Sequence, residues 1–189
     1  GNVNSTGTAA RFNEPIGVAA DAAGNVFVAD YINNAIKKVT PAGVVTTVYN
    51  VSQVFGIAID AAGNLYLTEY GFHKVSKYST AGNYSVIAGD GTSGTADGTG
   101  TAAKFNYPAG ITLDASGNLY VTETMNNRIR KITTAGVVTT LAGNTAGYAD
   151  GTGTAALFDA PIAACGDFAS NLLFIADFNN GKLRKMIIE

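Results

Sequence analysis

Residues 108–143 read PAGITLDASGNLYVTETMNNRIRKITTAGVVTTLAG, and this segment carries the strongest indication of the fold. Its apolar residues recur with period two in short runs rich in Val, Ile, Leu and Tyr, a pattern typical of β-strands. The segments Asp-Ala-Ser-Gly-Asn and Thr-Thr-Ala-Gly separate the runs, and their glycines can take the positive φ of a tight turn without steric cost. The stretch therefore predicts four strands, at 110–113, 118–122, 128–132 and 137–141.

The same pattern occurs three more times along the chain. The other copies begin near Pro15, Val54 and Pro161, and the last copy is degenerate and ends after its third strand. A unit of about 40 residues, lengthened by a loop insertion before the third and fourth copies, is typical of β-propeller blades. We expect a single all-β domain, residues 1–189, whose last blade lacks its outer strand. The repeats are expected at approximately 15–51, 52–105, 106–158 and 159–189.

The repeats resemble NHL repeats. The match lies in P-x-G-I/V-x-x-D-x-x-G-N-x-Y/F-V-x-D/E followed by N-x-R-I-R-K, which here reads Asn126-Asn127-Arg128-Ile129-Arg130-Lys131. The resemblance implies a β-propeller, most often six-bladed in that family, and the segments 88–108 and 142–161 are similar to those of exported bacterial proteins with many NHL repeats. Three interpretations of the ends stay open: part of a larger propeller, a four-bladed ring, or an open arc completed by another chain.

Composition excludes several classes of function. Twelve basic against 14 acidic residues give a net charge of −2, which is unsuited to nucleic-acid binding. No apolar run approaches the roughly 20 residues that span a bilayer, so no membrane insertion is expected. The lone Cys165 allows no intrachain disulfide, and we expect it to be a buried residue of an inner strand. Only 14% of the residues are charged, which favours an extracellular, cell-surface or periplasmic bacterial protein, although no signal peptide is visible.

One face of the propeller is expected to carry the binding site. The loops from the fourth strand to the next first strand, and from the second strand to the third, emerge together there, and binding residues concentrate on such loops. Aromatic side chains in Gly- and Thr-rich loops suit recognition of a protein or polysaccharide. The candidate binding residues are Tyr31, Tyr70, Phe72, His73, Tyr107, Asn126, Asn127 and Tyr148.

Repeated acidic residues are interpreted as structural. An acid ends the second strand of each repeat, and we expect it to accept hydrogen bonds from its own loop; these acids are Asp30, Glu69, Glu123 and Asp177. The loop residues Asp90, Asp97 and Asp150 are candidate calcium ligands, but calcium needs six to eight oxygens and the EF-hand spacing is absent. Asx-turns explain them better, so no cofactor or metal is expected, with calcium as the alternative.

No residue is assigned a catalytic role. His73 is the only histidine, with Glu69 four residues away, and no Ser or Cys lies in a nucleophile-elbow context. The sequence favours a non-enzymatic binding or scaffold module for a protein or polysaccharide. One alternative is a metal-dependent hydrolase or lyase, similar to propeller lactonases, with its site at the channel mouth. The other is an assembly unit that self-associates through an exposed edge strand at Lys182–Ile188.

Overall fold

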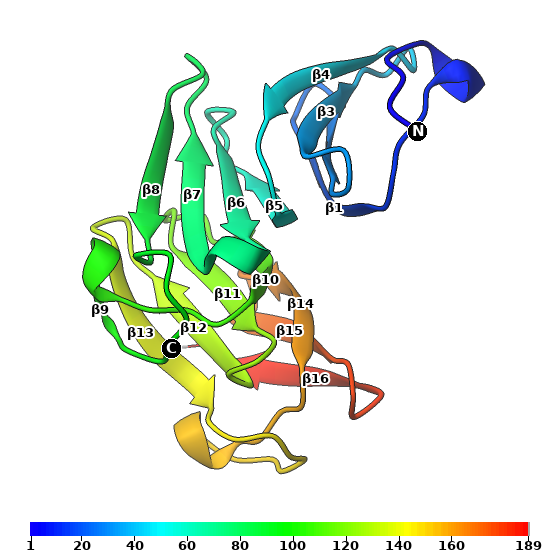
Figure 1. The fold of residues 1–189 in the computed structure, drawn as a ribbon. Coiled ribbons are helices and arrows are strands. Elements are labelled where there is room, and N and C mark those ends of the chain that lie inside the picture. Colours follow the sequence, from blue (N-terminus) through cyan, green and yellow to red (C-terminus); the bar gives the residue numbers. More distant parts are fainter. Residues whose placement is uncertain (189) are drawn as a thin grey trace.

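The computed structural model describes residues 1–188, and their regular secondary structure is almost entirely antiparallel β-strand (Figure 1). Four sheets form the blades of a β-propeller, as the repeat pattern predicts. Blade 1 consists of β1 (Pro15–Ala20), β2 (Val26–Asp30), β3 (Ala35–Val39) and β4 (Val45–Asn50). Blade 2 consists of β5 (Val54–Ile59), β6 (Leu65–Glu69), β7 (Lys74–Tyr78) and β8 (Tyr84–Ala88).

The remaining two blades differ in their outer strands. Blade 3 consists of β10 (Pro108–Leu113), β11 (Leu119–Glu123), β12 (Arg128–Ile132) and β13 (Val137–Gly143), with the short β9 (Gly98–Thr99) added beyond β13. Blade 4 consists of β14 (Pro161–Asp167), β15 (Leu172–Asp177) and β16 (Lys182–Ile187). Within residues 1–188 blade 4 therefore has three strands, which confirms the predicted lack of an outer strand. The other elements are four single turns of 3-10 helix: η1 (Gly7–Ala9), η2 (Tyr70–Phe72), η3 (Gly100–Ala102) and η4 (Gly153–Ala155).

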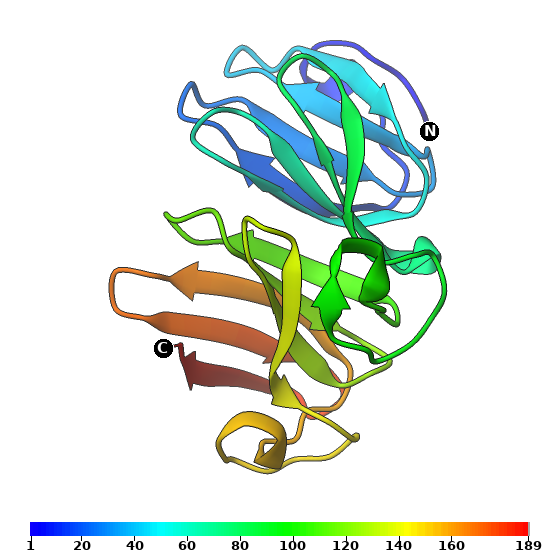
Figure 2. The same cartoon turned by 90° about the vertical axis from the view of Figure 1, so that its left-hand side faces the viewer.

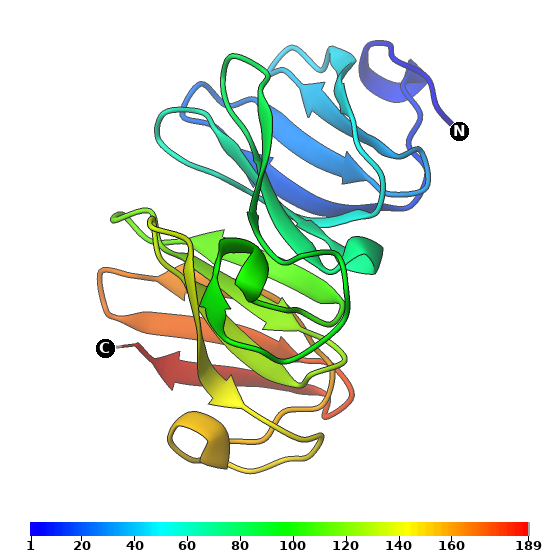
Figure 3. The same cartoon turned by 60° about the vertical axis from the view of Figure 1, so that its left-hand side comes forward.

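The core lies between blades rather than within them. The innermost strands pack in chain order, β1 on β5, β5 on β10 and β10 on β14. Figures 2 and 3 show the blades in the same order, with blade 1 and blade 4 at opposite ends of the arrangement. Each interface buries a separate apolar cluster, centred on Ile36 and Leu67, on Phe105 and Val121, and on Ile129 and Ile175. A single sheet exposes both faces, so each blade depends on its neighbours for burial.

Close approach of the inner strands requires glycine. A Cβ atom on Gly56 would lie 2.3 Å from the carbonyl oxygen of Ala109 in the next blade, and one on Gly110 would lie 2.6 Å from the Cα of Ala163. Both distances are shorter than carbon and oxygen atoms tolerate, and the contacts are with backbone that cannot rotate away. These glycines therefore set the distance between successive blades.

The outward faces of the first and last blades expose apolar side chains. Val18 of β1 is 65% exposed, and Leu183 and Ile187 of β16 are 74% and 72% exposed. Cys165 is also exposed, so the prediction that it is buried is wrong. Its cross-strand neighbours Phe174 and Lys185 share the face of blade 4 that points away from blade 3, and nothing within residues 1–188 covers that face.

None of the helical turns in residues 1–188 is long and apolar enough to cross a membrane.

Candidate functional site

An aromatic strip crosses the first three blades on the face where the inter-blade loops emerge. Tyr31 directly follows β2, Phe55 lies in β5, Tyr70 begins η2 after β6, and Tyr107 immediately precedes β10. Within each blade the first and second strands are antiparallel neighbours, so the start of the first strand lies beside the end of the second. These four residues therefore meet at one end of their sheets, and we call them the aromatic strip.

The rings of the aromatic strip contact one another in sequence. The centroids of Tyr31 and Phe55 are 6.3 Å apart, those of Phe55 and Tyr70 are 4.9 Å apart with planes 25° from parallel, and those of Tyr70 and Tyr107 are 4.7 Å apart. These separations lie in the range of favourable aromatic pairs. All four side chains are half-buried, so each ring also keeps an accessible surface.

Polar groups at the strip are fixed by hydrogen bonds. The Tyr31 hydroxyl donates to Oε1 of Gln53 at 2.9 Å. Burial raises the pKa of the Tyr70 hydroxyl, and the neighbouring hydroxyls of Tyr107 and Tyr31 raise it further. Tyr70 therefore stays protonated at neutral pH and can donate a hydrogen bond to a ligand.

His73 closes one end of the strip. Its ring lies edge-on to Tyr107 at 4.8 Å, and its Nδ1 accepts a hydrogen bond of 3.1 Å from the backbone N–H of Tyr107. An accepting Nδ1 assigns the proton of the neutral ring to Nε2. Burial lowers the pKa of His73, which favours this neutral form. The adjacent Phe72 is 43% exposed, and the ammonium of Lys74 lies over its ring at 5.4 Å from the centroid.

The acid at the end of the second strand is a structural clamp in three blades. Its carboxylate pairs with a buried cation of the third strand: Asp30 with Lys37 at 3.0 Å, Glu123 with Arg130 at 2.7 Å, and Asp177 with Arg184 at 2.9 Å. It also accepts a backbone N–H from the preceding loop, donated by Asn13, Asn106 and Asp159 respectively. Each acid also accepts a side-chain N–H from the tight loop that follows its strand, donated by Asn33, Asn126 and Asn180 respectively. The expectation that these acids accept hydrogen bonds from their own loops is therefore confirmed for Asp30, Glu123 and Asp177.

The clamp cation reaches the loop that precedes its blade. Arg130 donates to the carbonyl oxygens of Ala96 and Lys104 and to Oδ1 of Asp97 at 2.7 Å. Arg184 repeats this arrangement with the carbonyls of Ala149 and Leu157 and with Asp150 at 2.6 Å. Burial raises the pKa of Glu123, while Arg130 and the amide donors lower it. One buried cation therefore joins the second strand, the third strand and the loop.

Blade 2 lacks both the long loop and the cation. Only residues 51–53 join β4 to β5, and Ser76 stands where blade 3 has Arg130. Glu69 instead accepts a hydrogen bond of 2.6 Å from the Tyr84 hydroxyl and pairs with Lys74 at 3.5 Å. The Ser76 hydroxyl is buried without a hydrogen-bond partner. Glu69 is therefore held by a neighbouring strand and not by a loop.

The three candidate calcium ligands lie apart from one another. Asp97 and Asp150 pair with the clamp arginines of different blades, and Asp90 pairs with Lys104 at 3.1 Å. The predicted Asx-turn is present at Asp90, whose Oδ1 accepts the N–H of Thr92 at 2.8 Å. In residues 1–188 no three His, Cys, Asp or Glu side chains gather as they would around a metal ion.

The other candidate binding residues are placed away from the strip. Asn126 donates to Glu123 and to the carbonyl of Gly94, and Asn127 accepts the N–H of Ala160 through its Oδ1 at 2.9 Å. Tyr148 lies over the guanidinium of Arg184 at 4.8 Å on the outer loop of blade 4. The structure thus gathers Tyr31, Tyr70, His73 and Tyr107 at one place.

Phe55 of the strip, and Gln53, which accepts the hydrogen bond of Tyr31, were not singled out in the sequence. Phe55 occupies a position of the inner strand that holds Ile16, Ala109 and Ile162 in the other blades. The aromatic substitution at this repeat position is the signal that identifies it, together with the short 51–53 link beside it.

Comparisons with known proteins agree with the fold. Residues 2–152 match the family model described as the teneurin NHL domain. "NHL repeat-containing protein 2" from Homo sapiens is 34% identical over 100 residues, 51% of this chain and 14% of that protein. "Protein SUPPRESSOR OF QUENCHING 1, chloroplastic" from Arabidopsis thaliana is 34% identical over 93 residues, 48% of this chain and 9% of that protein. The chain therefore spans a small part of the length of these relatives.

Solved structures share the blade arrangement. A protein of unknown function from Bacteroides thetaiotaomicron superposes with a TM-score of 0.84 at 24% identity, over 94% of this chain and 48% of that one. An auxiliary nutrient binding protein from Bacteroides ovatus gives 0.78 at 23%, over 93% and 48%. A streptogramin B lyase gives 0.63 at 17%, over 98% and 58%. At these identities the likeness extends to the fold alone.

Proposed function

The chain belongs to the teneurin NHL domain family, and on that premise we propose that it is a non-enzymatic binding module whose ligand lies on the aromatic strip. The ligand class is a polysaccharide or a protein. Sugar rings and apolar protein side chains both pack against exposed aromatic faces, and tyrosine adds a hydroxyl for a hydrogen bond.

The observation that carries this proposal is the position of the strip beside the one blade without a long loop. Blades 1, 3 and 4 are each preceded by a segment containing a 3-10 turn, whereas three residues lead into blade 2. Phe55 and Tyr70 of blade 2 are stacked rings, and Tyr31 and Tyr107 extend the surface to the neighbouring blades. A ligand here can contact three blades at once.

Two further features support binding in preference to catalysis. The carboxylates of Asp30, Glu123 and Asp177 are each engaged by a cation and a backbone N–H, so they are committed to structure. The auxiliary nutrient binding protein from Bacteroides ovatus has the same fold, and its name gives binding as its role. We further propose that the chain works outside the bacterial cytoplasm, in line with its low charge, although NHL relatives also occur in human and plant proteins.

Affinity gel electrophoresis tests the proposal, with soluble xylan, β-glucan, pectin or mannan cast separately into native gels. We expect retardation in at least one of these gels. Tyr70→Ala should weaken the interaction by at least about fivefold, since a stacked aromatic contact is worth about 1 kcal/mol beyond its buried area. Tyr148→Ala is the matched control, because it removes an exposed tyrosine from another loop, and it should leave retardation unchanged.

A protein ligand is tested with the same variants. A binding partner is first recovered on the immobilised wild-type chain, and its affinity for the wild type and for each variant is then measured. Equal affinity of the wild type and Tyr70→Ala for every ligand found would contradict the proposal. So would turnover of a lactone that is abolished by Glu69→Gln or His73→Asn, which would support the hydrolase or lyase alternative.

A further inference from the structure

Tyr107 is the last ring of the aromatic strip, and the side chain of His73 holds its backbone in place. The Tyr107 N–H donates to Nδ1 of His73 at 3.1 Å, and the two rings meet edge-on at 4.8 Å. On its other side the Tyr107 ring lies 4.7 Å from the ring of Tyr70. A change at His73 therefore reaches the strip directly, through one hydrogen bond and one ring contact.

Tyr107 has a backbone conformation that needs this support. Its φ is +54°, in the left-handed region that a bulky side chain rarely adopts. It also precedes Pro108, and the residue before a proline favours an extended backbone. Such a conformation persists only where neighbours hold it, and here His73 accepts the N–H while the Thr124 N–H donates to the carbonyl at 3.1 Å. Loss of the His73 acceptor would free Tyr107 to extend and to move its ring away from Tyr70.

Blade 3 makes the same contact with a side chain that does not titrate. Asn127 holds the position of His73, and its Oδ1 accepts the N–H of Ala160 at 2.9 Å. Both of these residues have positive φ, as His73 and Tyr107 do. An amide oxygen accepts a hydrogen bond at every pH, whereas an imidazole nitrogen accepts one only when the ring is neutral. The contact of blade 2 therefore depends on pH, and that of blade 3 does not.

The charged groups of the elements around His73 are paired with one another. On its own blade Glu69 pairs with Lys74 at 3.5 Å. The loop packed against the His73 backbone, where a Cβ on Gly89 would lie 2.5 Å from the His73 carbonyl oxygen, carries Asp90 and Lys104, which pair at 3.1 Å. Burial lowers the pKa of His73, as expected for an imidazole without a carboxylate partner. The ring is therefore neutral at pH 7.5 and gains its proton in mildly acidic solution.

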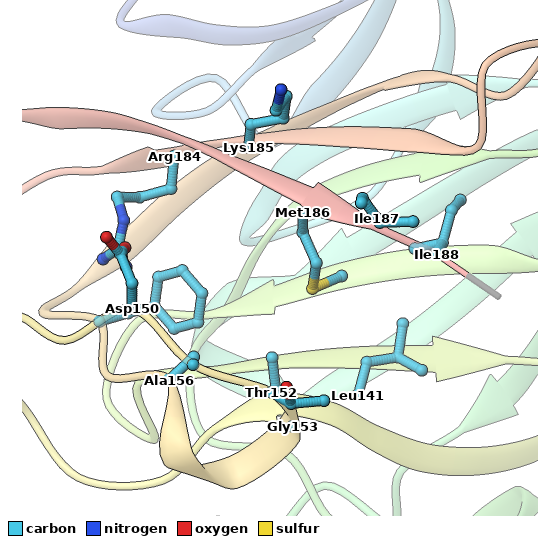
Figure 4. A pocket seen from close by; sticks show the side chains of 13 residues that line it. Leu141, Asp150, Thr152, Gly153, Ala156, Arg184, Lys185, Met186, Ile187 and Ile188 are labelled. Carbon is cyan, nitrogen blue, oxygen red and sulfur yellow. The ribbon is translucent and has the colours of Figure 1, made fainter.

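The acids of the long loops are held in contacts of their own. The Asp90 carboxylate accepts two hydrogen bonds from Thr92, which with Lys104 lower its pKa to about 2. On the outer loop of blade 4, Asp150 lies beside Arg184 at 2.6 Å (Figure 4). Carboxyl groups ordinarily titrate below pH 5, and His73 is the only histidine of the chain. A change of the strip between pH 7.5 and 5.0 that is absent from a His73 variant can thus be assigned to this ring.

We propose that His73 is a pH-dependent switch of the aromatic strip. With a neutral ring, Nδ1 holds the Tyr107 N–H and the strip has four rings. Protonation makes Nδ1 a donor, so the hydrogen bond is lost and the Tyr107 ring leaves the strip. The effect on binding rests on the proposed function: a ligand that contacts Tyr107 is held at neutral pH and released in acidic solution, as in other histidine switches.

An NMR titration tests the switch without a ligand. The single histidine gives one ring Cε1–H signal, and ¹⁵N-tyrosine labelling gives nine tyrosine amide signals. Tyr107→Phe keeps the ring and the N–H but removes one labelled signal, which assigns Tyr107. We expect the Tyr107 amide to titrate with the same midpoint as the His73 ring, below pH 6.5, and to stay constant in His73→Asn. A Tyr107 amide that does not shift while His73 titrates would overturn the proposal.

Isothermal titration calorimetry at pH 7.5 and 5.0 tests the effect on binding, with the polysaccharide that retards the chain in the native gels. Wild-type affinity should be at least about fivefold lower at pH 5.0, the value of one aromatic contact. In His73→Asn the affinity should change by less than about twofold between the two pH values, because the amide oxygen keeps its acceptor. His73→Ala lacks an acceptor at both pH values and should bind as weakly at pH 7.5 as the wild type does at pH 5.0.

The two measurements separate failure of the switch from failure of the proposed function. Equal wild-type affinity at the two pH values, or the same loss in His73→Asn, would overturn the switch and leave binding by the strip intact. Absence of any ligand at pH 7.5 would contradict the proposed function, and the NMR titration would still decide whether Tyr107 follows His73. Circular dichroism establishes that each variant is folded.

Discussion

Blades 2 and 3 differ in the partner that pairs with the buried glutamate at the end of the second strand. Each ends its second strand with a buried glutamate, Glu69 or Glu123, that has to be paired. Blade 3 pairs Glu123 with Arg130, which also holds the preceding loop. Blade 2 has no long loop, and Tyr84 reaches Glu69 from the position that Val138 occupies in blade 3.

The difference shows that the clamp cation and the long loop belong together. A buried guanidinium needs several acceptors, and the loop carbonyls and Asp97 supply them. Without the loop, an arginine at position 76 would have only Glu69 as a partner. Loss of the loop also leaves the mouth of blade 2 uncovered, which is where Phe55 and Tyr70 present their rings.

Arg130→Ala should have the largest effect, because it breaks the blade 3 clamp. It would leave Glu123 buried without its cation and the loop carbonyls without a donor, which typically costs about 3–5 kcal/mol. Urea denaturation measures the loss in free energy of unfolding. Lys131→Ala is the control, since Lys131 is a half-buried cation of the same strand whose ammonium lies 5.7 Å from the ring of Tyr120. A loss below about 1 kcal/mol for Arg130→Ala would refute the clamp.

Tyr84→Phe should have the next largest effect, because it breaks the substitute pairing in blade 2. Burial and the hydrogen bond to Glu69 raise the pKa of Tyr84, so the hydroxyl donates to the carboxylate throughout the physiological range. Its removal should cost about 1.5 kcal/mol, the value of a hydrogen bond to a charged group. Tyr78→Phe, in the adjacent ring, is the control in the same denaturation experiment, and equal losses would argue against a special role of Tyr84.

Ser76→Ala changes the residue that stands in blade 2 where blade 3 has Arg130. The Ser76 hydroxyl is buried without a partner, so its removal should change the free energy of unfolding by less than about 0.5 kcal/mol or raise it. Thr68→Ala is the control, because Thr68 Oγ1 accepts the N–H of Gly56 at 2.8 Å and its loss should destabilise. A large loss in Ser76→Ala would mean that Ser76 supports Glu69.

His73→Asn should have the smallest effect on stability, and the effect should be seen only as a change in how stability depends on pH. Asn127 holds the matching position of blade 3, also at positive φ, and its Oδ1 accepts the equivalent backbone N–H, so asparagine preserves the contact. Because burial lowers the pKa of His73, the unfolded chain binds more protons than the folded chain just below pH 6.5. Wild-type stability should therefore decline as pH falls through that range.

The control for His73→Asn lies in the pH profile itself. The difference in melting temperature between the two proteins should change between pH 7.5 and 5.5, while the carboxylates, which are common to both, cancel from the difference. A constant difference over this range would show that His73 does not titrate differently on folding.

Local patterns determined how much of the fold could be predicted. Alternating residues and Gly-containing turns specify strands such as Leu119–Glu123 within a few positions, and repetition of the pattern specified the propeller. The same repetition indicated that Glu123 serves its own loop. The burial of Cys165 was predicted wrongly, because the pattern of one strand does not show whether a blade covers each of its faces.

Contacts between distant residues could not be predicted from the sequence. Asp97 and Arg130 are 33 positions apart, so their pairing was hidden and Asp97 was assigned to a local turn. Phe55 lies within an apolar strand and gave no sign that its ring meets Tyr70. In each case a local pattern identified the element but not the partner that the next blade or loop supplies.

Amide hydrogen exchange of Arg130→Ala tests most directly whether the clamp cation holds the loop. Exchange in residues 90–105 should become faster than in the wild type, while β10–β12 stay protected and Lys131→Ala, on the same strand but in contact with Tyr120, behaves as the wild type. Unchanged protection of residues 90–105 in Arg130→Ala would contradict the pairing of cation and loop on which the comparison of the two blades rests.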